Sequence, residues 1–309
     1  MSVLHIERKF RKLGQSGLES FPLAYGCWRF AGTDVATARR KIEVALEAGI
    51  NLFDHADIYG VDGDGQFGDA EALFGQVLAE APQLRDQMII ATKGGIVLGE
   101  PYDSSPAWIR QACEDSLRRL GVDVIDLYQI HRPDFLGHPA LVADTLSALR
   151  EEGKIRHVGV SNHTTSQLRA LQAHLAFPIA TRQPELSCWH HEPLKNGVLD
   201  QCMELDITPL AWSPIAGGQL AQDAQSAKSA GNERLADLLN TLDEVANAQG
   251  VDRISVALAW LLAHPAGIIP IIGTQREERI RQSMRAFDVS LNRSTWNKIL
   301  VAAQGEPLP

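Results

Sequence analysis

The chain has 309 residues, 45% of them hydrophobic and 22% charged, a composition typical of a folded globular protein. Its formal net charge of −9 argues against nucleic acid as a partner, because phosphates require a basic surface. No apolar run reaches the roughly 18 residues of a membrane span, and no apolar segment typical of a signal peptide opens the chain. The four cysteines are widely spaced and suggest no disulfide pattern, so we expect a reduced, cytoplasmic protein.

Short apolar strands alternate with amphipathic helices through the first half. Before them, two short strands around Gly14 and Gly17 predict a hairpin that caps one end of the fold. Helix boundaries carry recognisable signals: Asp34 as an N-cap, Pro106 in a first turn, and a Thr164 to Gln167 capping box. Strands are predicted at 23–26, 51–54, 88–93, 124–131 and 157–162, and helices at 35–49, 69–80, 104–121, 140–153 and 164–174.

The second half continues the alternation less evenly. A long segment, 216–232, has no clear periodicity and is predicted to be irregular. The stretch after it places leucines at helical spacing and predicts a long helix at 234–250. The remaining strands are predicted at 180–183, 207–213 and 267–273, and the remaining helices at 197–206, 254–264, 277–287 and 295–304.

These elements make eight strand-helix units, the number that closes a (β/α)8 TIM barrel. The strands are continuous apolar runs, as expected for a parallel sheet that is covered on both faces. With no linker-like composition inside the chain, we expect one domain over 1–309, with the N-terminal hairpin as a cap and a C-terminal helical tail. A doubly wound α/β sheet is the alternative, but no G-x-G-x-x-G follows the first strand.

Ionisable side chains follow the ends of three successive predicted strands. Asp54 ends the second strand and Tyr59 lies in the loop after it, Lys93 ends the third, and His131 ends the fourth. Barrel strands end at one face, so we expect these four side chains in one cleft. An ammonium lowers the pKa of a nearby phenol, a carboxylate keeps that ammonium charged, and a histidine adds a hydrogen-bond donor. Each residue alone has an ordinary structural explanation, but together they suit protonation of a carbonyl oxygen.

The chain resembles the aldo-keto reductase family along nearly its whole length. In that family an aspartate, a tyrosine, a lysine and a histidine form a catalytic tetrad, which falls here on Asp54, Tyr59, Lys93 and His131, with Tyr59 as general acid. The resemblance rests on segments in matching order: RKLGQSGLESFPLAYGCW (11–28), FDHADIYG (53–60), ATKGG (91–95), LYQIHRPD (127–134), KIRHVGVSN (154–162) and IIPIIGTQREERIRQS (268–283).

The resemblance also implies an NADPH site without a Rossmann fold. It places Ser161, Asn162 and Gln183 on the nicotinamide carboxamide, and Trp212 against the ring, where tyrosine or phenylalanine is commoner. Other expected contacts are Ser213, Ile215, Gly217 and Gly218 along the pyrophosphate, Thr274 and Arg279 at the 2′-phosphate, and Gln282 and Ser283 at the adenine, where asparagine often replaces the last residue. Arg276 is expected on the same helix as Arg279.

The substrate wall is expected to include Trp28 and Arg29, with the loop at 61–69 and Trp189 as further candidates. We expect no metal site, because the adjacent His190 and His191 point in different directions and no third ligand has suitable spacing.

The leading hypothesis from the tetrad and the family resemblance is an NADPH-dependent reductase that converts an aldehyde or ketone to an alcohol. Two alternatives stay open: a cofactor-sensing regulatory subunit on the same scaffold, and a sugar or alcohol dehydrogenase that works in the oxidative direction. The sequence names neither the carbonyl substrate nor the oligomeric state.

Overall fold

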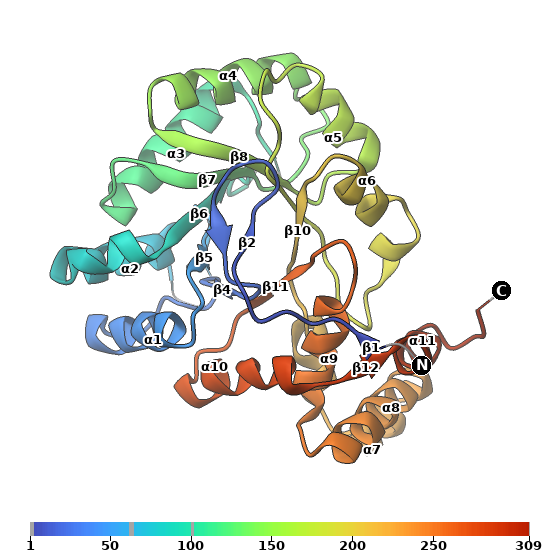
Figure 1. Ribbon diagram of the computed structural model, residues 1–309. Helices are drawn as coiled ribbons and strands as arrows, with labels where there is room; N and C mark the ends of the chain where they lie inside the picture. The colour runs from blue at the N-terminus through green and yellow to red at the C-terminus, as the bar shows by residue number, and fades with distance from the viewer. Residues whose placement is uncertain (1–2, 62–64, 100–101, 309) are drawn as a thin grey trace.

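The protein folds into a closed barrel of eight parallel strands surrounded by helices, as the sequence predicts (Figure 1). The computed structural model describes residues 3–61, 65–99 and 102–308. Around the barrel the strands run in the order β10-β11-β4-β5-β6-β7-β8-β9, so each pairs with its neighbours in sequence and the ring closes between β11 and β4. The strands are β4 (Ala24–Gly26), β5 (Leu52–Asp54), β6 (Ile89–Gly94), β7 (Ile125–Ile130), β8 (Ile155–Ser161), β9 (Thr181–Gln183), β10 (Thr208–Ala211) and β11 (Ile269–Ile272).

Helices cover the outside of the barrel and begin and end where the local sequence dictates. Asp34 accepts a hydrogen bond from the Thr37 amide at 2.8 Å, and Thr164 and Gln167 form the predicted capping box. Gly121 adopts a left-handed conformation, with φ 64°, where the third helix ends. The covering helices are α1 (Val35–Glu47), α2 (Asp69–Glu80), α3 (Pro106–Leu120), α4 (Pro139–Glu151), α5 (Thr165–Gln172), α6 (Val198–Glu204), α9 (Arg253–Leu262) and α10 (Glu277–Ser283).

The N-terminal hairpin closes the end of the barrel opposite the catalytic face. Strands β2 (Arg11–Lys12) and β3 (Glu19–Ser20) pair antiparallel, and Figure 1 shows β2 in front of the barrel opening. Leu13, in the hairpin turn, is fully buried and packs with Leu52, Leu127 and Leu210 inside the barrel. The amide of Gly14 donates to the Thr208 hydroxyl at 2.8 Å, which holds the turn against β10. This plug leaves the other end of the barrel as the place for a site.

The C-terminal part contains more structure than the sequence predicts. The segment predicted as irregular, 216–232, contains a 3-10 turn (Ala216–Ala221) and the helix α7 (Ala224–Ser229), which Asp223 caps through the Ser226 amide. The predicted helix 277–287 is divided into α10 and a 3-10 turn (Met284–Asp288). Helices α8 (Glu233–Gln249) and α11 (Arg293–Gln304) pack beside each other, and β1 (Val3–Leu4) pairs with β12 (Leu291–Asn292). The segment that forms α7 was missed because a short polar helix lacks the apolar periodicity on which the prediction relied.

Candidate active site

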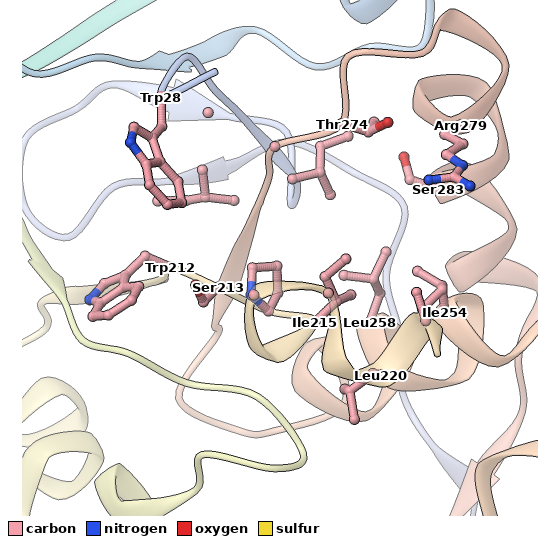
Figure 2. A pocket seen from close by; sticks show the side chains of 18 of the residues that line it. Trp28, Trp212, Ser213, Ile215, Leu220, Ile254, Leu258, Thr274, Arg279 and Ser283 are labelled. Atoms are coloured by element: carbon pink, nitrogen blue, oxygen red, sulfur yellow. The ribbon is translucent and has the colours of Figure 1, made fainter. Parts of the chain in front are cut away.

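A cavity of about 1020 Å³ opens at the carboxyl ends of the barrel strands. Its lining runs from Trp28 and Trp212 at one end to Arg279 and Ser283 at the other (Figure 2). Of the predicted catalytic and cofactor-contacting residues, only Lys93 does not line the cavity, because it is fully buried behind the residues that do. The predicted residues in the lining are Trp28, Arg29, Asp54, Tyr59, His131, Ser161, Asn162, Gln183, Trp212, Ser213, Ile215, Gly217, Gly218, Thr274, Arg279, Gln282 and Ser283.

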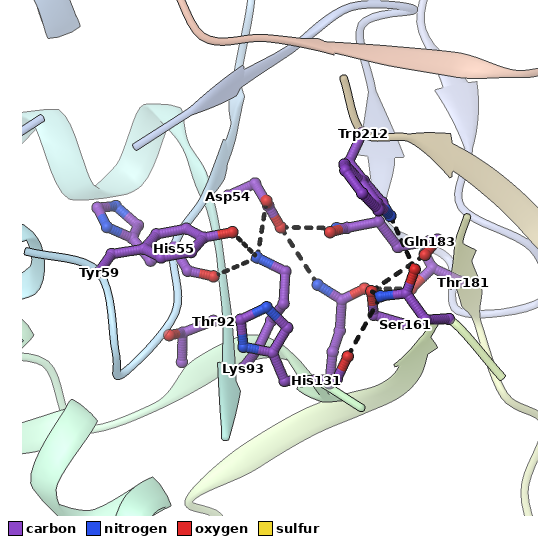
Figure 3. A network of polar contacts seen from close by, with 12 residues as sticks. Asp54, His55, Tyr59, Thr92, Lys93, His131, Ser161, Thr181, Gln183 and Trp212 are labelled. Atoms are coloured by element: carbon purple, nitrogen blue, oxygen red, sulfur yellow. Dashed lines mark hydrogen bonds and ion pairs between the residues drawn. The ribbon is translucent and has the colours of Figure 1, made fainter. Parts of the chain in front are cut away.

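Lys93 lies at the centre of the four predicted catalytic residues (Figure 3). Its Nζ donates to Asp54 Oδ2 at 2.8 Å, to the His55 carbonyl at 2.6 Å and to the Tyr59 hydroxyl at 3.0 Å. The three donors of the ammonium are therefore all used, and its position is fixed. The ring of His131 lies edge-on to Tyr59, with 5.9 Å between the ring centroids. The structure thus brings an ammonium, a phenol and an imidazole together at the cavity wall.

The loop that carries Tyr59 is tied to the neighbouring strand and helix. The Asp57 amide donates to the Lys93 carbonyl at 2.9 Å, and the Tyr59 amide donates to the Ala56 carbonyl at 3.0 Å. The Ala70 amide, in the first turn of α2, donates to the Tyr59 carbonyl at 3.1 Å. Gly60 follows with φ 125°, and an added Cβ there would lie 2.5 Å from the Gln66 carbonyl oxygen. The backbone on both sides of Tyr59 is therefore fixed, which places its hydroxyl over Lys93.

The pKa of Tyr59 is raised overall, although Lys93 lowers it as the sequence predicts. Burial of the phenol is the largest cause of the rise, and the positive charge of Lys93 opposes it without reversing it. Burial alone would lower the pKa of Lys93, but attraction by Asp54 and Tyr59 raises it overall. Burial, followed by repulsion from Lys93, holds the pKa of His131 well below its usual value. At neutral pH the site therefore contains a protonated phenol, a charged ammonium and a neutral imidazole.

Polar side chains beside the four residues form a second hydrogen-bonded group. Ser161 and Asn162, at the end of β8, bond to each other, with 2.7 Å between Asn162 Nδ2 and Ser161 Oγ. Trp212 Nε1 donates to Asn162 Oδ1 at 3.0 Å. Gln183 Nε2 donates to Asp54 Oδ1 at 2.9 Å, which joins this group to the first (Figure 3). The residues predicted to hold a carboxamide are therefore adjacent and connected to Asp54.

The opposite end of the cavity is cationic. Arg279 is exposed, and within the part of the chain that the structure describes neither Arg279 nor Arg276 forms an ion pair. The expectation that Arg276 lies on the same helix is wrong: it is the N-cap residue of α10, with extended backbone angles. Its amide donates to the Thr274 hydroxyl at 3.3 Å. Two guanidinium groups thus border the cavity end where a phosphate group is expected.

Three further residues belong to the site but were missed in the sequence. Arg132 lines the cavity, with its guanidinium 5.6 Å from the Trp212 ring centroid. Gln129 and Thr181 lie in the barrel interior next to Asp54. Strand alternation could have found Gln129, since it lies two residues before His131 and so shares its face.

Two predicted parts of the substrate wall are not seen at the cavity. Trp189 is not part of the cavity lining and lies under the Arg234 guanidinium instead, with 4.1 Å between the guanidinium and the indole ring centroid. In the loop expected to join the substrate wall, 62–64 lie outside the described residues.

Comparison with known proteins identifies the family. The model of the Aldo/keto reductase family matches residues 22–302. The chain belongs to the aldo-keto reductase family. A 6-dehydroglucose reductase from Novosphingobium aromaticivorans is 51% identical over 311 residues, with all of both chains covered. A second 6-dehydroglucose reductase, from Agrobacterium fabrum, is 38% identical over 301 residues, 94% of this chain and 96% of the relative.

Solved structures agree with this assignment. A glycerol dehydrogenase from Gluconobacter oxydans superposes with a TM-score of 0.82 and 28% sequence identity, covering 98% of each chain. The family and these relatives make the chain an oxidoreductase of the aldo-keto reductase type, a family that typically uses nicotinamide cofactors and small carbonyl substrates. Among the described residues, no helix combines the length and the apolar character that crossing a membrane requires.

Proposed function

We propose that this oxidoreductase reduces an aldehyde or ketone to an alcohol with NADPH, and that Tyr59 is the proton donor. The observation that carries the proposal is the 3.0 Å contact between Lys93 Nζ and the Tyr59 hydroxyl at the wall of a cavity that His131 also lines. A phenol kept protonated by burial has a proton to give, and an adjacent ammonium stabilises the phenolate that remains.

The cavity suits an elongated dinucleotide. Hydroxyl and amide groups of Ser161, Asn162 and Gln183 gather at the end near Tyr59, and Arg276 and Arg279 border the other end. Between them, Gly217 and Gly218 have φ of 64° and 101°, and an added Cβ at either position would meet open space. Backbone can therefore approach a diphosphate closely there. The donors fit a carboxamide at one end and a phosphate at the other.

Each residue then has one task in the reduction. NADPH, when bound, supplies a hydride to the carbonyl carbon. Tyr59 gives its proton to the carbonyl oxygen, so that the product is a neutral alcohol. Lys93 stabilises the phenolate, and Asp54 holds Lys93 in place. His131, neutral at working pH, donates a hydrogen bond to the carbonyl oxygen and orients it.

The substrate end of the cavity favours an oxygen-rich carbonyl compound. Trp28 and Trp212 lie across from each other there (Figure 2), and Arg29 and Arg132 each place a guanidinium over one of these indoles. Indole faces pack against C–H groups, and guanidinium groups donate to hydroxyl oxygens. Two relatives are named 6-dehydroglucose reductases, and glucose dehydrogenated at carbon 6 is a polyhydroxylated aldehyde, so we propose such an aldehyde as the substrate class.

The oxidative direction is the second candidate, because one similar structure is that of a glycerol dehydrogenase. The same residues serve both directions, since Tyr59 returns as the base that removes the alcohol proton. The site residues give no separate support to a purely regulatory role. One domain over 1–309 and a cytoplasmic location stay predictions.

Turnover of the purified protein tests the proposal. NADPH absorbance is followed with a panel of aldehydes that includes sugar aldehydes of increasing length and unsubstituted alkanals. We expect oxidation of NADPH, with higher kcat/KM for the hydroxylated members. No turnover with any carbonyl compound, in a protein that binds NADPH, would overturn the reductase assignment. NADP+ reduction by polyols but no aldehyde reduction would favour the oxidative direction.

A further inference from the structure

Gln129, in β7, is a buried amide that the proposed reaction does not use. Its side chain is fully buried inside the barrel and does not line the cavity. Nε2 donates to Asp54 Oδ1 at 3.3 Å, and Oε1 accepts from the Thr181 hydroxyl at 3.3 Å. The barrel interior below is apolar, with Leu52 and Leu127 fully buried. A buried glutamine among such residues is costly unless both ends of its amide are bonded, as they are here.

The neighbouring strand is shaped to admit this amide. Gln129 pairs with Lys93 on one side and with Gly159 on the other, and Gly159 pairs with Thr181. A Cβ added at Gly159 would lie 2.2 Å from Thr181 Oγ1 and 2.9 Å from Gln129 Cγ. Only glycine leaves room at this position for the glutamine to reach across the barrel. The contact therefore depends on three strands and not on one side chain alone.

Asp54 receives donors from three different strands. Lys93 takes Oδ2, whereas Gln129 and Gln183 share Oδ1. The two amides differ in their surroundings, because Gln183 lines the cavity and Gln129 does not. Under the proposed function Gln183 contacts the cofactor, so its bond to Asp54 is open to change when the cofactor binds. Gln129 is the donor that no ligand in the cavity reaches.

We propose that Gln129 is a positioning residue of the reaction: it holds Oδ1 of Asp54 so that Oδ2 stays aimed at Lys93 and the ammonium stays beside Tyr59. A carboxylate with one free oxygen can rotate and offer Lys93 a different geometry. With Oδ1 fixed, rotation breaks a hydrogen bond in a dry interior, where such a loss is costly. Asp54 fixes the direction of the amide, because a carboxylate only accepts hydrogen bonds and must face Nε2, and the Thr181 hydroxyl then anchors Oε1. The inference rests on the proposed function.

The substitution Gln129→Met tests this role, since methionine fills a similar volume without a donor. We expect kcat for aldehyde reduction to fall by about three- to tenfold, the effect of one lost hydrogen bond. The Kd for NADPH should change by less than about twofold, because Gln129 lies outside the cavity. The decisive measurement is the pair with Asp54→Asn. If Gln129 acts through Asp54, the double variant should be within about twofold of Asp54→Asn alone.

A matched control separates positioning from loss of stability. Gln172 also uses both ends of its amide, with Nε2 donating to the Phe177 carbonyl at 2.9 Å and Oε1 accepting from the Ile179 amide at 2.8 Å. It lies at the end of α5, outside the cavity lining. Gln172→Met should lower the melting temperature and leave kcat unchanged. Should Gln129→Met not fold, Thr181→Val keeps the glutamine and should lower kcat in the same direction by a smaller factor.

The kcat values of the single variant, the double variant and the unmodified protein distinguish three outcomes. Loss of kcat in Gln129→Met with no further loss in the double variant supports the inference. An unchanged kcat in Gln129→Met overturns the inference and leaves the proposed function intact. So does a double variant whose loss of kcat equals the product of the two single losses. No turnover in the unmodified protein overturns the proposed function and this inference with it.

Discussion

The indole Nε1 of Trp212 donates a hydrogen bond to Oδ1 of Asn162 at 3.0 Å. An indole nitrogen is a donor only, so the amide oxygen of Asn162 must face it. This leaves Nδ2 to donate to Ser161 Oγ at 2.7 Å and towards the His131 carbonyl at 3.4 Å. Asn162 also has a left-handed backbone, with φ 57°, which asparagine tolerates better than most residues. Trp212 therefore gives the amide oxygen of Asn162 a hydrogen-bond donor that phenylalanine lacks.

Replacing Trp212 with phenylalanine should weaken NADPH binding while keeping an aromatic face at the cavity wall. We expect about a two- to tenfold rise in the Kd for NADPH, because one neutral hydrogen bond to the Asn162 amide oxygen is lost. Fluorescence titration with NADPH measures the change. Trp189→Phe serves as the control, since that indole lies outside the cavity lining and should leave the Kd unchanged. Equal affinities of the Trp212→Phe and unmodified proteins would show that the hydrogen bond is irrelevant to cofactor binding.

Tyr59→Phe should abolish most of the carbonyl reduction. The variant lacks the proposed proton donor but keeps the ring that packs beside His131. We expect kcat to fall by about 10²- to 10⁴-fold, the usual contribution of general acid catalysis, with the Kd for NADPH nearly unchanged. Steady-state kinetics with the best aldehyde of the panel, together with the NADPH titration, measures both quantities. Near-normal turnover in this variant would exclude Tyr59 as the acid.

Lys93→Met should cost more catalytic rate than Asp54→Asn. Lys93 contacts the Tyr59 hydroxyl directly, and its charge lowers the pKa of the phenol against the larger effect of burial. Removing that charge should raise the pKa of Tyr59 further, so the pH dependence of the residual rate should shift to higher pH. Asp54 contacts Lys93 and not the Tyr59 hydroxyl, and asparagine at that position still offers an oxygen acceptor. Pre-steady-state rates of hydride transfer give the comparison, and a slower chemical step in Asp54→Asn than in Lys93→Met would contradict the order.

The barrel was predictable because its signals are local and repeated. Eight apolar runs, each followed by a helical segment, specify the fold through their periodicity. The three strand ends that carry Asp54, Lys93 and His131 followed from the same pattern, since barrel strands end at one face. The structure places them within one group, with Lys93 Nζ 2.8 Å from Asp54 Oδ2.

The parts that were missed depend on spatial neighbours. Gln129 looks like any polar residue in an apolar strand until Thr181 and Asp54, from two other strands, are placed beside it. Lys93 lowers the pKa of Tyr59 as predicted, but the degree of burial, which outweighs this effect and raises the pKa overall, is not readable from the sequence. Arg276 was assigned to a helix on spacing alone, whereas α10 begins one residue later.

His55 should make the protein less stable in acid. Its ring is fully buried against Phe74, neither ring nitrogen has a hydrogen-bond partner among the described residues, and burial lowers its pKa to about 3. The unfolded His55 takes up a proton near pH 6.5, so between about pH 6.5 and 3 the unfolded state binds more protons and stability falls as pH falls, by up to about 1.4 kcal/mol per pH unit.

The substitution His55→Gln isolates this contribution. Asp57 is also buried, and burial raises the pKa of its carboxyl well above the usual value, which opposes the histidine effect over part of the same range. The difference in unfolding free energy between the two proteins removes that background. We expect the disadvantage of the unmodified protein relative to His55→Gln to grow as pH is lowered from about 6.5. A difference that does not vary with pH in denaturant titrations would show that His55 is not buried in its neutral form.

We expect the choice between NADPH and NADH to be decided at the cationic end of the cavity. Arg279 is exposed there, and Thr274 lines the same end. A guanidinium forms charge-assisted, bidentate bonds with phosphate, and NADH lacks the 2′-phosphate that would receive them. We therefore expect NADPH to bind about ten- to a hundredfold more tightly than NADH at low salt, and the ratio to shrink as ionic strength rises.

Arg279→Ala should weaken NADPH binding strongly and NADH binding little, because only NADPH loses a phosphate contact. Arg281→Ala is the matched control: it lies on the same helix but pairs with Glu47 and Glu277, so it should leave both affinities unchanged. Fluorescence titration of each variant with both cofactors, at two salt concentrations, gives the comparison. Equal binding of NADPH and NADH by the unmodified protein would refute the phosphate site. It would leave the roles of Tyr59 and Lys93 untouched, because Tyr59 lines the other end of the cavity and Lys93 lies behind it.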